Sequence, residues 1–207
     1  MIKDQTIENF LDELASKSAT PGGGSAAAIM GSMGAALISM VCNLTIGKKN
    51  HEAVEPEMRE VLHQAEALRK ALLDMVNQDV SVFDQVMAAY GLPRETDQEK
   101  ADRSAKIQEA LKAATRVPLL CASASVEVIQ LSKAVAERGN KNVVSDAGVA
   151  AMAAMAAFRS AALNVHVNAG VIRDEAFVDS SLKQLNELDL GLSELVESIY
   201  ATVRERL

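Results

Sequence analysis

The residue best suited to acid–base chemistry is Asp79, which lies in the middle of a long helical pattern. Met75 precedes it by one turn and Phe83 follows it by one turn, so its carboxyl group falls near the apolar stripe of that helix. A carboxylate there either caps or pairs with another group, or is held against apolar surface with its pKa raised toward a useful acid–base range. The residues alone leave both interpretations open.

A run of glycines is the sharpest local feature: Pro21 is followed by Gly22, Gly23, Gly24 and Ser25, directly before an apolar helical segment. Free N–H groups and the positive dipole end of a helix can form an anion-receptive pocket at such a place. The run lacks the Lys-Ser/Thr of a P-loop and follows no strand, which argues against nucleotide binding. The alternative is a tight connection between two helices, with Ser25 as the N-cap of the second.

Two polar clusters flank the apolar segments. Lys48 and Lys49 follow the first segment, where they either complement the helix dipole or clamp the carboxylates of a substrate. Asn142 and Asp146 open the second segment, where capping by Ser145 or Asp146 accounts for the carboxylate but hardly for the amide of Asn142.

Metal binding and a hydrolase triad are not indicated. His166 has no second His or Cys at ligand spacing. No recognised local motif assembles a Ser–His–Asp triad. Cys42 and Cys121 form no CxxC pair, and two cysteines alone imply neither a disulfide framework nor a zinc site. We therefore expect no metal.

Helices must position these groups, because no run of residues alternates between apolar and polar for long enough to indicate a strand. The sequence predicts an all-α, single-domain bundle of about six to seven helices over residues 1–207. Thr96 and Glu99 match a capping box, and Pro118 is expected to bend or restart the chain. The expected helices cover residues 6–16, 26–46, 56–90, 97–116, 118–138, 147–167 and 174–206.

Two of these segments are rich in alanine and glycine and almost free of charge. Residues 26–46 carry none, and residues 147–167 carry only Arg159. The first is close to the ~20 apolar residues of a membrane span, yet its internal Ser32 and Asn43 and its many alanines favour a buried helix. One thin bundle hardly covers two such helices, so we predict a homodimer with both near the interface. The alternative is that both lie wholly inside one chain.

Composition narrows the class of protein. Hydrophobic residues make up 49% of the 207 residues and charged residues 24%, which is enough for a packed core. A net charge of -7 argues against a nucleic-acid partner bound through phosphate neutralisation. Residues 1–5 contain no apolar segment of a signal peptide, so a cytoplasmic location is expected.

The stretch from Ala19 to Ala28, which holds the glycine run, resembles the C-terminal family of the formiminotransferase–cyclodeaminases. Further matches follow along nearly the whole chain, in residues 43–49, 79–83, 91–93, 96, 99–100, 107–112, 117–119, 139–140, 142, 145–146, 164–165 and 168. The resemblance implies an all-helical fold that dimerises and chemistry on a one-carbon unit carried by tetrahydrofolate. The folate derivative would be the substrate, with no prosthetic group.

The family carries out two reactions. Cyclodeaminases convert 5-formiminotetrahydrofolate into 5,10-methenyltetrahydrofolate and ammonia, whereas cyclohydrolases hydrolyse the methenyl compound. Residues 34–43, 89–93 and 159–165 are more similar to the stand-alone cyclohydrolases. The cyclodeaminase remains the alternative activity, and a non-catalytic helical dimer that scaffolds partners is the alternative class.

The resemblance also implies roles for residues. It puts a catalytic carboxylate at Asp79. We hypothesise that Gly22, Gly23, Gly24 and Ser25 form a wall beside the pterin. The remaining substrate-binding candidates are Lys48 and Lys49, for the glutamate carboxylates, and Asn142 and Asp146, for the donor edge of the pterin.

Overall fold

A computed structural model describes residues 2–207, apart from the side chain of Lys3, and in this range the chain forms helices and no strand. The predicted all-α fold is thereby confirmed. A short 3-10 turn, Ile2–Asp4, precedes the first helix, and a second one, Lys141–Val143, precedes the fifth. The helices are α1 Ile7–Leu14, α2 Gly23–Asn43, α3 Glu55–Tyr90, α4 Asp97–Arg138, α5 Val144–Ala169, α6 Glu175–Asp189 and α7 Leu192–Arg206.

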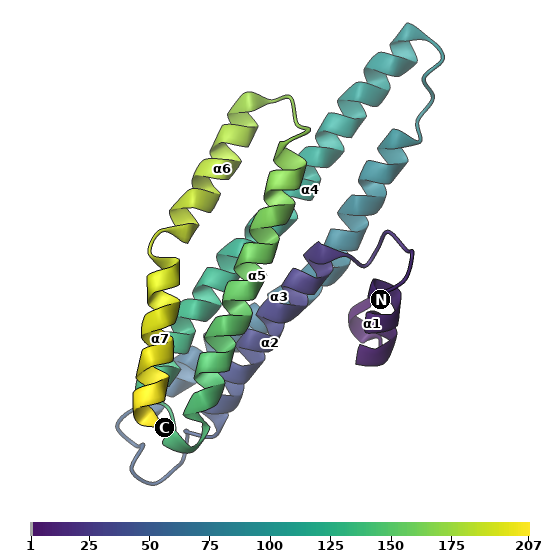
Figure 1. The fold of residues 1–207 in the computed structure, drawn as a ribbon. Coiled ribbons are helices and arrows are strands. Elements are labelled where there is room, and N and C mark those ends of the chain that lie inside the picture. Colours follow the sequence, from purple (N-terminus) through teal and green to yellow (C-terminus); the bar gives the residue numbers. More distant parts are fainter. Residues whose placement is uncertain (1) are drawn as a thin grey trace.

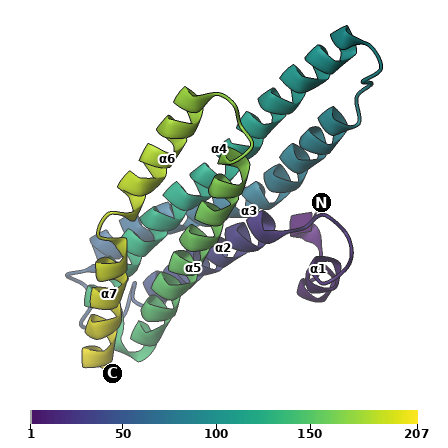
Figure 2. The same cartoon turned by 45° about the horizontal axis from the view of Figure 1, so that its top comes forward.

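Four helices form the body of the bundle. α2 packs against α3 and α5, and α4 packs against the other side of α3 and α5. α6 and α7 lie along α4 and α5, while α1 stands apart beside the beginning of α2 (Figure 1). With 36 and 42 residues, α3 and α4 are ~54 and ~63 Å long, so their paired ends project beyond the rest of the bundle (Figure 2).

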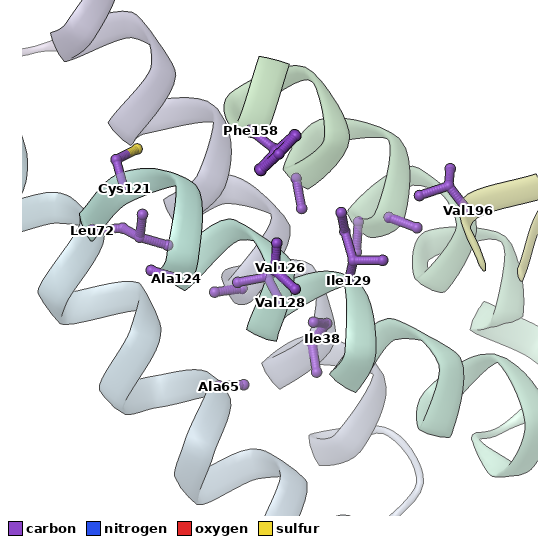
Figure 3. Close-up of a cluster of buried hydrophobic side chains, with 14 of the residues drawn as sticks. Ile38, Ala65, Leu72, Cys121, Ala124, Val126, Val128, Ile129, Phe158 and Val196 are labelled. Atoms are coloured by element: carbon purple, nitrogen blue, oxygen red, sulfur yellow. The ribbon is translucent and has the colours of Figure 1, made fainter. Parts of the chain in front are cut away.

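Small side chains let α2 approach its neighbours closely. A Cβ atom on Gly34 would lie 2.9 Å from the carbonyl oxygen of Ala150, and one on Gly31 would lie 3.1 Å from Leu72. The core around these contacts is aliphatic: Ile38 of α2, Leu72 of α3 and Ile129 of α4 gather in it with the ring of Phe158 (Figure 3).

The ends of several helices follow local sequence signals. The capping box is confirmed: the Thr96 hydroxyl accepts the Glu99 N–H, and the Glu99 carboxylate accepts the Thr96 N–H. Asp174 caps α6 in the same manner by accepting the N–H of Phe177. Two other predicted caps are wrong. α2 already begins at Gly23, which makes Ser25 a first-turn residue, and α5 begins at Val144, before both Ser145 and Asp146.

Pro118 does not interrupt the fourth helix, contrary to the prediction. Proline removes the N–H that would bond to the carbonyl four residues earlier, here that of Ala114. The side-chain amide of Asn168 on α5 donates to this carbonyl oxygen at 3.1 Å. Because a neighbouring helix satisfies the freed acceptor, α4 continues through Pro118 to Arg138.

The C-terminal region forms two helices instead of the single one predicted. α6 ends at Asp189 and α7 begins at Leu192, with Gly191 between them at a φ of 69°. This left-handed conformation suits glycine and turns the chain sharply. The break lets α7 pack against both α4 and α5.

The two alanine-rich helices are buried on one side only. α2 turns Met33 and Met40 outward, and α5 turns Val149, Met152, Leu163 and Val167 outward. The alternative that both helices lie wholly inside one chain is therefore wrong. By length and composition alone, α2, α4 and the segment Lys141–Ala169 are apolar enough to cross a membrane, and the windows concerned are 61%, 61% and 44% buried within the bundle.

Candidate active site

Asp79 faces the first turn of α2. The Ser25 hydroxyl donates to its Oδ2 atom at 2.8 Å, and the Ser25 backbone N–H also donates to the carboxylate. Ser25 is fully buried and Asp79 is half-buried. A negative charge at this place is favoured by the dipole of α2. The anion-receptive helix start expected from the glycine run thus receives a carboxylate of the protein itself.

Only one of the three glycines is required by this contact. A Cβ atom on Gly24 would lie 2.1 Å from Oδ1 of Asp79, far inside van der Waals contact. A Cβ atom on Gly23 would meet the Asn164 side chain at 3.7 Å, an ordinary contact, and one on Gly22 would meet a backbone oxygen at 3.8 Å. Gly24 is therefore the position that lets the carboxylate come up against the α2 backbone.

Burial raises the pKa of the Asp79 carboxyl above its ordinary value, and the hydrogen bonds from Ser25 oppose that rise. Desolvation disfavours the charged form, whereas donors aimed at the carboxylate favour it. Asp79 therefore does both things that the sequence left open: it caps α2, and its pKa is shifted toward the range useful for proton transfer.

A small cavity of about 10 Å³ lies beside this carboxylate, with room for about one water molecule. Its lining includes Gly24, Met75 and Asp79 together with Pro118 and Cys121. Burial raises the pKa of the Cys121 thiol to about 12, so the thiol is neutral next to Asp79. The cavity is too small to hold a ring system, so any molecule larger than water would have to reach Asp79 from outside it.

Sequence reasoning assigned no role in the site to three residues that lie around the first turn of α2 and its cavity. Asn164 lies against Gly23 and keeps its amide near the start of α2, although the amide nitrogen donates to the carbonyl of Ser160. Pro118 and Cys121 line the cavity. Asn164 and Pro118 fall within the stretches that carry the family resemblance, and that was their only signal in the sequence. Nothing in the sequence distinguished Cys121.

The other predicted binding residues lie at the opposite end of α2. The amide of Asn140 donates to the carbonyl of Leu44 at 2.8 Å, which ties the turn before α5 to the end of α2. Lys48, Lys49, Asn142 and Asp146 follow α2 or flank this turn. With 21 residues, α2 is ~30 Å long, so a single chain does not bring these side chains to Asp79. Their role in binding stays a prediction.

Larger hollows lie elsewhere on the described surface. A groove of about 460 Å³ between the projecting ends of α3 and α4 is lined by alanines together with Gln85, Lys106 and Arg116. It shares no residue with the cavity beside Asp79. Among residues 2–207, no group of three His, Cys, Asp or Glu side chains is placed to hold a metal ion.

The protein is thus an all-α helical bundle whose candidate site is a half-buried carboxylate against a glycine-rich helix start. Comparison with known proteins identifies its family. The model of the Formiminotransferase-cyclodeaminase family matches residues 6–187. The chain belongs to this family, which confirms the resemblance seen in the sequence.

Individual relatives include both activities of the family. The chain is 57% identical to a methenyltetrahydrofolate cyclohydrolase of Methylorubrum extorquens, over the full length of both proteins. It is 31% identical over 185 residues to the rat formimidoyltransferase-cyclodeaminase, covering 89% of this chain and 34% of the rat protein. The crystal structure of a formiminotetrahydrofolate cyclodeaminase from Thermotoga maritima superposes with a TM-score of 0.84 at 33% identity, covering 100% of this chain and 98% of the other.

Proposed function

We propose that this chain is a methenyltetrahydrofolate cyclohydrolase, which hydrolyses 5,10-methenyltetrahydrofolate to 10-formyltetrahydrofolate. The observation that carries the proposal is the 57% identity to the Methylorubrum cyclohydrolase along the whole of both chains. The half-buried Asp79 supplies a chemical group that suits the reaction. The tetrahydrofolate derivative is a substrate and not a resident cofactor.

In the first step, water attacks the cationic methenyl carbon between N5 and N10 of the folate. A C–O bond forms while Asp79, in its ionised form, takes one proton from the water. The negative carboxylate also stabilises the cation electrostatically before the attack. The small cavity beside Asp79, with room for one water molecule, lies next to this base.

In the second step, the tetrahedral adduct collapses. Its hydroxyl proton leaves to solvent as the C=O bond forms, the bond from carbon to N5 breaks, and Asp79 returns its proton to N5. One proton is released for each substrate consumed, and Asp79 ends ionised as it began. The hydrogen bond from Ser25 holds the carboxylate in place through both steps.

Formiminotetrahydrofolate cyclodeaminase is the second candidate activity. It is favoured by the TM-score of 0.84 to the Thermotoga protein, whose chain is covered almost completely. The same base would take the proton of the attacking nitrogen and pass it to the departing ammonia, so Asp79 serves both reactions. Ammonia release from 5-formiminotetrahydrofolate distinguishes this activity from hydrolysis of the methenyl compound.

The test is the loss of the methenyl absorbance at near-neutral pH, with Asp79→Asn as the variant. We expect the enzymatic rate to fall by ~10²–10⁴, the usual contribution of a general acid–base group. Asp84→Asn is the matched control, because Asp84 is an exposed carboxylate on the same helix and its replacement leaves the rate unchanged. A wild-type rate no faster than spontaneous hydrolysis contradicts the proposal.

The stability of Asp79→Asn separates a catalytic loss from misfolding. The pKa of Asp79 is raised on folding, so ionisation is less favourable in the folded chain than in the unfolded one. The charge thus lowers stability once the pH exceeds the unfolded pKa, and full ionisation near neutral pH includes the whole of this cost. We therefore expect the melting temperature of the asparagine variant at pH 7 to equal or exceed that of the wild type.

We further propose that the protein is a homodimer in solution. Its support is the apolar face that α2 and α5 leave uncovered, on which Met33 is 58% exposed and Val167 is 72% exposed. Contiguous apolar patches of this kind mark interaction surfaces on soluble proteins. Sedimentation or light scattering at micromolar concentration measures the mass, and a monomer contradicts the proposal.

A further inference from the structure

The site around Asp79 is incomplete in a single chain for a folate substrate. Its polar partner is Ser25, the amide of Asn164 lies against the neighbouring Gly23, and its cavity has room for one water molecule. Beyond Asp79, the projecting part of α3 carries Phe83 and Tyr90 at helical spacing on the same side. These two aromatic side chains offer apolar surface to a ring. The lysines predicted to hold the glutamate carboxylates, however, lie at the other end of α2.

The uncovered apolar face begins at this site and runs the length of α2. Along α2 and its C-cap it consists of Met30, Met33, Leu37, Met40 and Leu44, which recur every three or four residues, and α2 has no charged residue. On α5 the outward stripe holds Val149, Met152, Ala156, Leu163 and Val167. Arg159 lies at the edge of this stripe, between Ala156 and Leu163, and its charge is paired with Asp189 at the end of α6.

The size of this face fits a second copy of the chain. Two packed helices ~30 Å long and ~10 Å apart present a flat area of ~600 Å² before side-chain relief is counted. A stable protein–protein interface covers about 800 Å² on each partner. An isologous interface uses the same patch on both subunits, and a face that is apolar along its whole length can meet its own copy in this way.

Two arrangements with a two-fold axis are open to such a face. An axis along the helices places α2 against the partner's α5 and brings like ends together. An axis across the helices places α2 antiparallel to its own copy and brings opposite ends together. In the first arrangement Lys48 and Lys49 approach the same lysines of the partner.

Charge favours the second arrangement. The loop after α2 carries Lys48 and Lys49 against one acid, Glu52, and so has a net positive charge. In contrast, α1, beside the beginning of α2, carries Glu8, Asp12 and Glu13 (Figure 1). The antiparallel arrangement sets the basic loop of one copy against this acidic end of the other, and complementary potentials are what interfaces select. An axis midway between Met33 and Met40 sets the first turn of α2 opposite the partner's loop.

We propose that the active site is shared between two copies of the chain, with Asp79 from one and Lys48 and Lys49 from its partner. The inference rests on the proposed function, because it assigns the lysines to the glutamate carboxylates of the folate tail. The pterin lies at Asp79 and Phe83 of one copy, and the tail reaches the loop after α2 of the other. This arrangement reunites the groups that a single chain holds ~30 Å apart.

Subunit complementation tests the shared site. Asp79→Asn and the double variant Lys48→Gln/Lys49→Gln are purified separately, and each is expected to lose tenfold or more in kcat/KM. The two are then mixed in equal amounts, unfolded and refolded together. In a shared site, half of the dimers are mixed and each has one intact site, so activity returns to about a quarter of the wild type. In a site built from one chain, the mixture stays at about a twentieth.

A matched control and two outcomes complete this test. Lys133→Gln/Lys183→Gln removes two exposed lysines on α4 and α6 and is expected to leave kcat/KM unchanged. If the Lys48→Gln/Lys49→Gln variant is as active as the wild type, or if mixing restores nothing, the shared site is wrong while the cyclohydrolase stands. If Asp79→Asn is fully active, the proposed catalytic mechanism itself is wrong.

Cross-linking tests the geometry without any substrate. Met33→Cys and Met40→Cys are prepared separately, mixed, refolded and oxidised. The antiparallel arrangement predicts a disulfide-linked dimer in the mixture and little in either variant alone, because Met33 faces Met40 of the partner subunit. The native Cys42 and Cys121 are buried. A dimer that does not cross-link in the mixture, a monomer, or a protein extracted only by detergent each overturns the proposal.

Discussion

Replacing Gly24 by alanine tests whether the exact position of the Asp79 carboxylate matters. The new Cβ atom would lie 2.1 Å from Oδ1 and 2.6 Å from Cγ of Asp79, whereas ordinary contacts begin at 3.4 Å. The carboxylate must therefore retreat by about 1 Å from the first turn of α2. A catalytic group misplaced by this amount can lose ~10²-fold in rate.

The effect of Gly24→Ala on stability is smaller, because two contributions oppose each other. Losing the hydrogen bond from Ser25 to the carboxylate costs ~1.5–3 kcal/mol. Exchanging glycine for alanine within a helix returns up to ~1 kcal/mol. We expect a net loss of ~0.5–2 kcal/mol, which lowers the melting temperature of a chain of this size by a few degrees.

The assay is the decay of methenyl absorbance, read beside thermal melting by circular dichroism. Gly23→Ala is the matched control, since its Cβ atom would meet only the Asn164 side chain at ordinary distance. We expect Gly23→Ala to keep the wild-type rate within about threefold, a change of ~0.6 kcal/mol. A folded Gly24→Ala variant with the wild-type rate would refute the argument that the carboxylate must touch the α2 backbone.

Three further outcomes are expected. The rate should fall as the pH drops through the raised pKa of Asp79, because only the ionised carboxylate accepts a proton from water; a rate that stays constant down to the ordinary range of aspartate would contradict this. Ser25→Ala removes a donor that lowers this pKa, so the acid limb of the pH–rate profile should move to higher pH, and an unmoved limb would argue against the contact. Thr96→Ala breaks the capping box at the beginning of α4 and should lower the free energy of unfolding in urea by ~1 kcal/mol with no change in kcat. A large loss of activity would instead link the connection between α3 and α4 to catalysis.

Much of the fold could be predicted because its signals are local. Helical periodicity and the Thr96–Glu99 capping box mark the elements within a few residues of themselves. The predictions that proved wrong depend on partners far along the chain. Pro118 was expected to bend or restart the chain, but one helix continues through it, and the amide that bonds to the freed carbonyl comes from Asn168, 50 residues later.

In the candidate site, too, local features could be predicted from the sequence, whereas contacts between distant residues could not. Asp79 was recognisable because a carboxylate near an apolar helical stripe is unusual, and the glycine run because of its composition. That these two features meet, and that Gly24 alone of the three glycines is needed there, depends on how α2 packs on α3. The separation of Lys48 and Lys49 from Asp79 depends on the length and direction of α2.

By itself the sequence determined that this chain is a helical bundle, which family it resembles, and which carboxylate is the candidate base. Periodicity, glycine runs and isolated charges act over one or two helical turns, so they can be read along the chain. Only the tertiary structure decided that Asp79 both caps α2 and has a raised pKa, and that α2 and α5 each leave one apolar side uncovered. Those properties depend on the exclusion of water and on distances between helices, and neither exists until the helices pack.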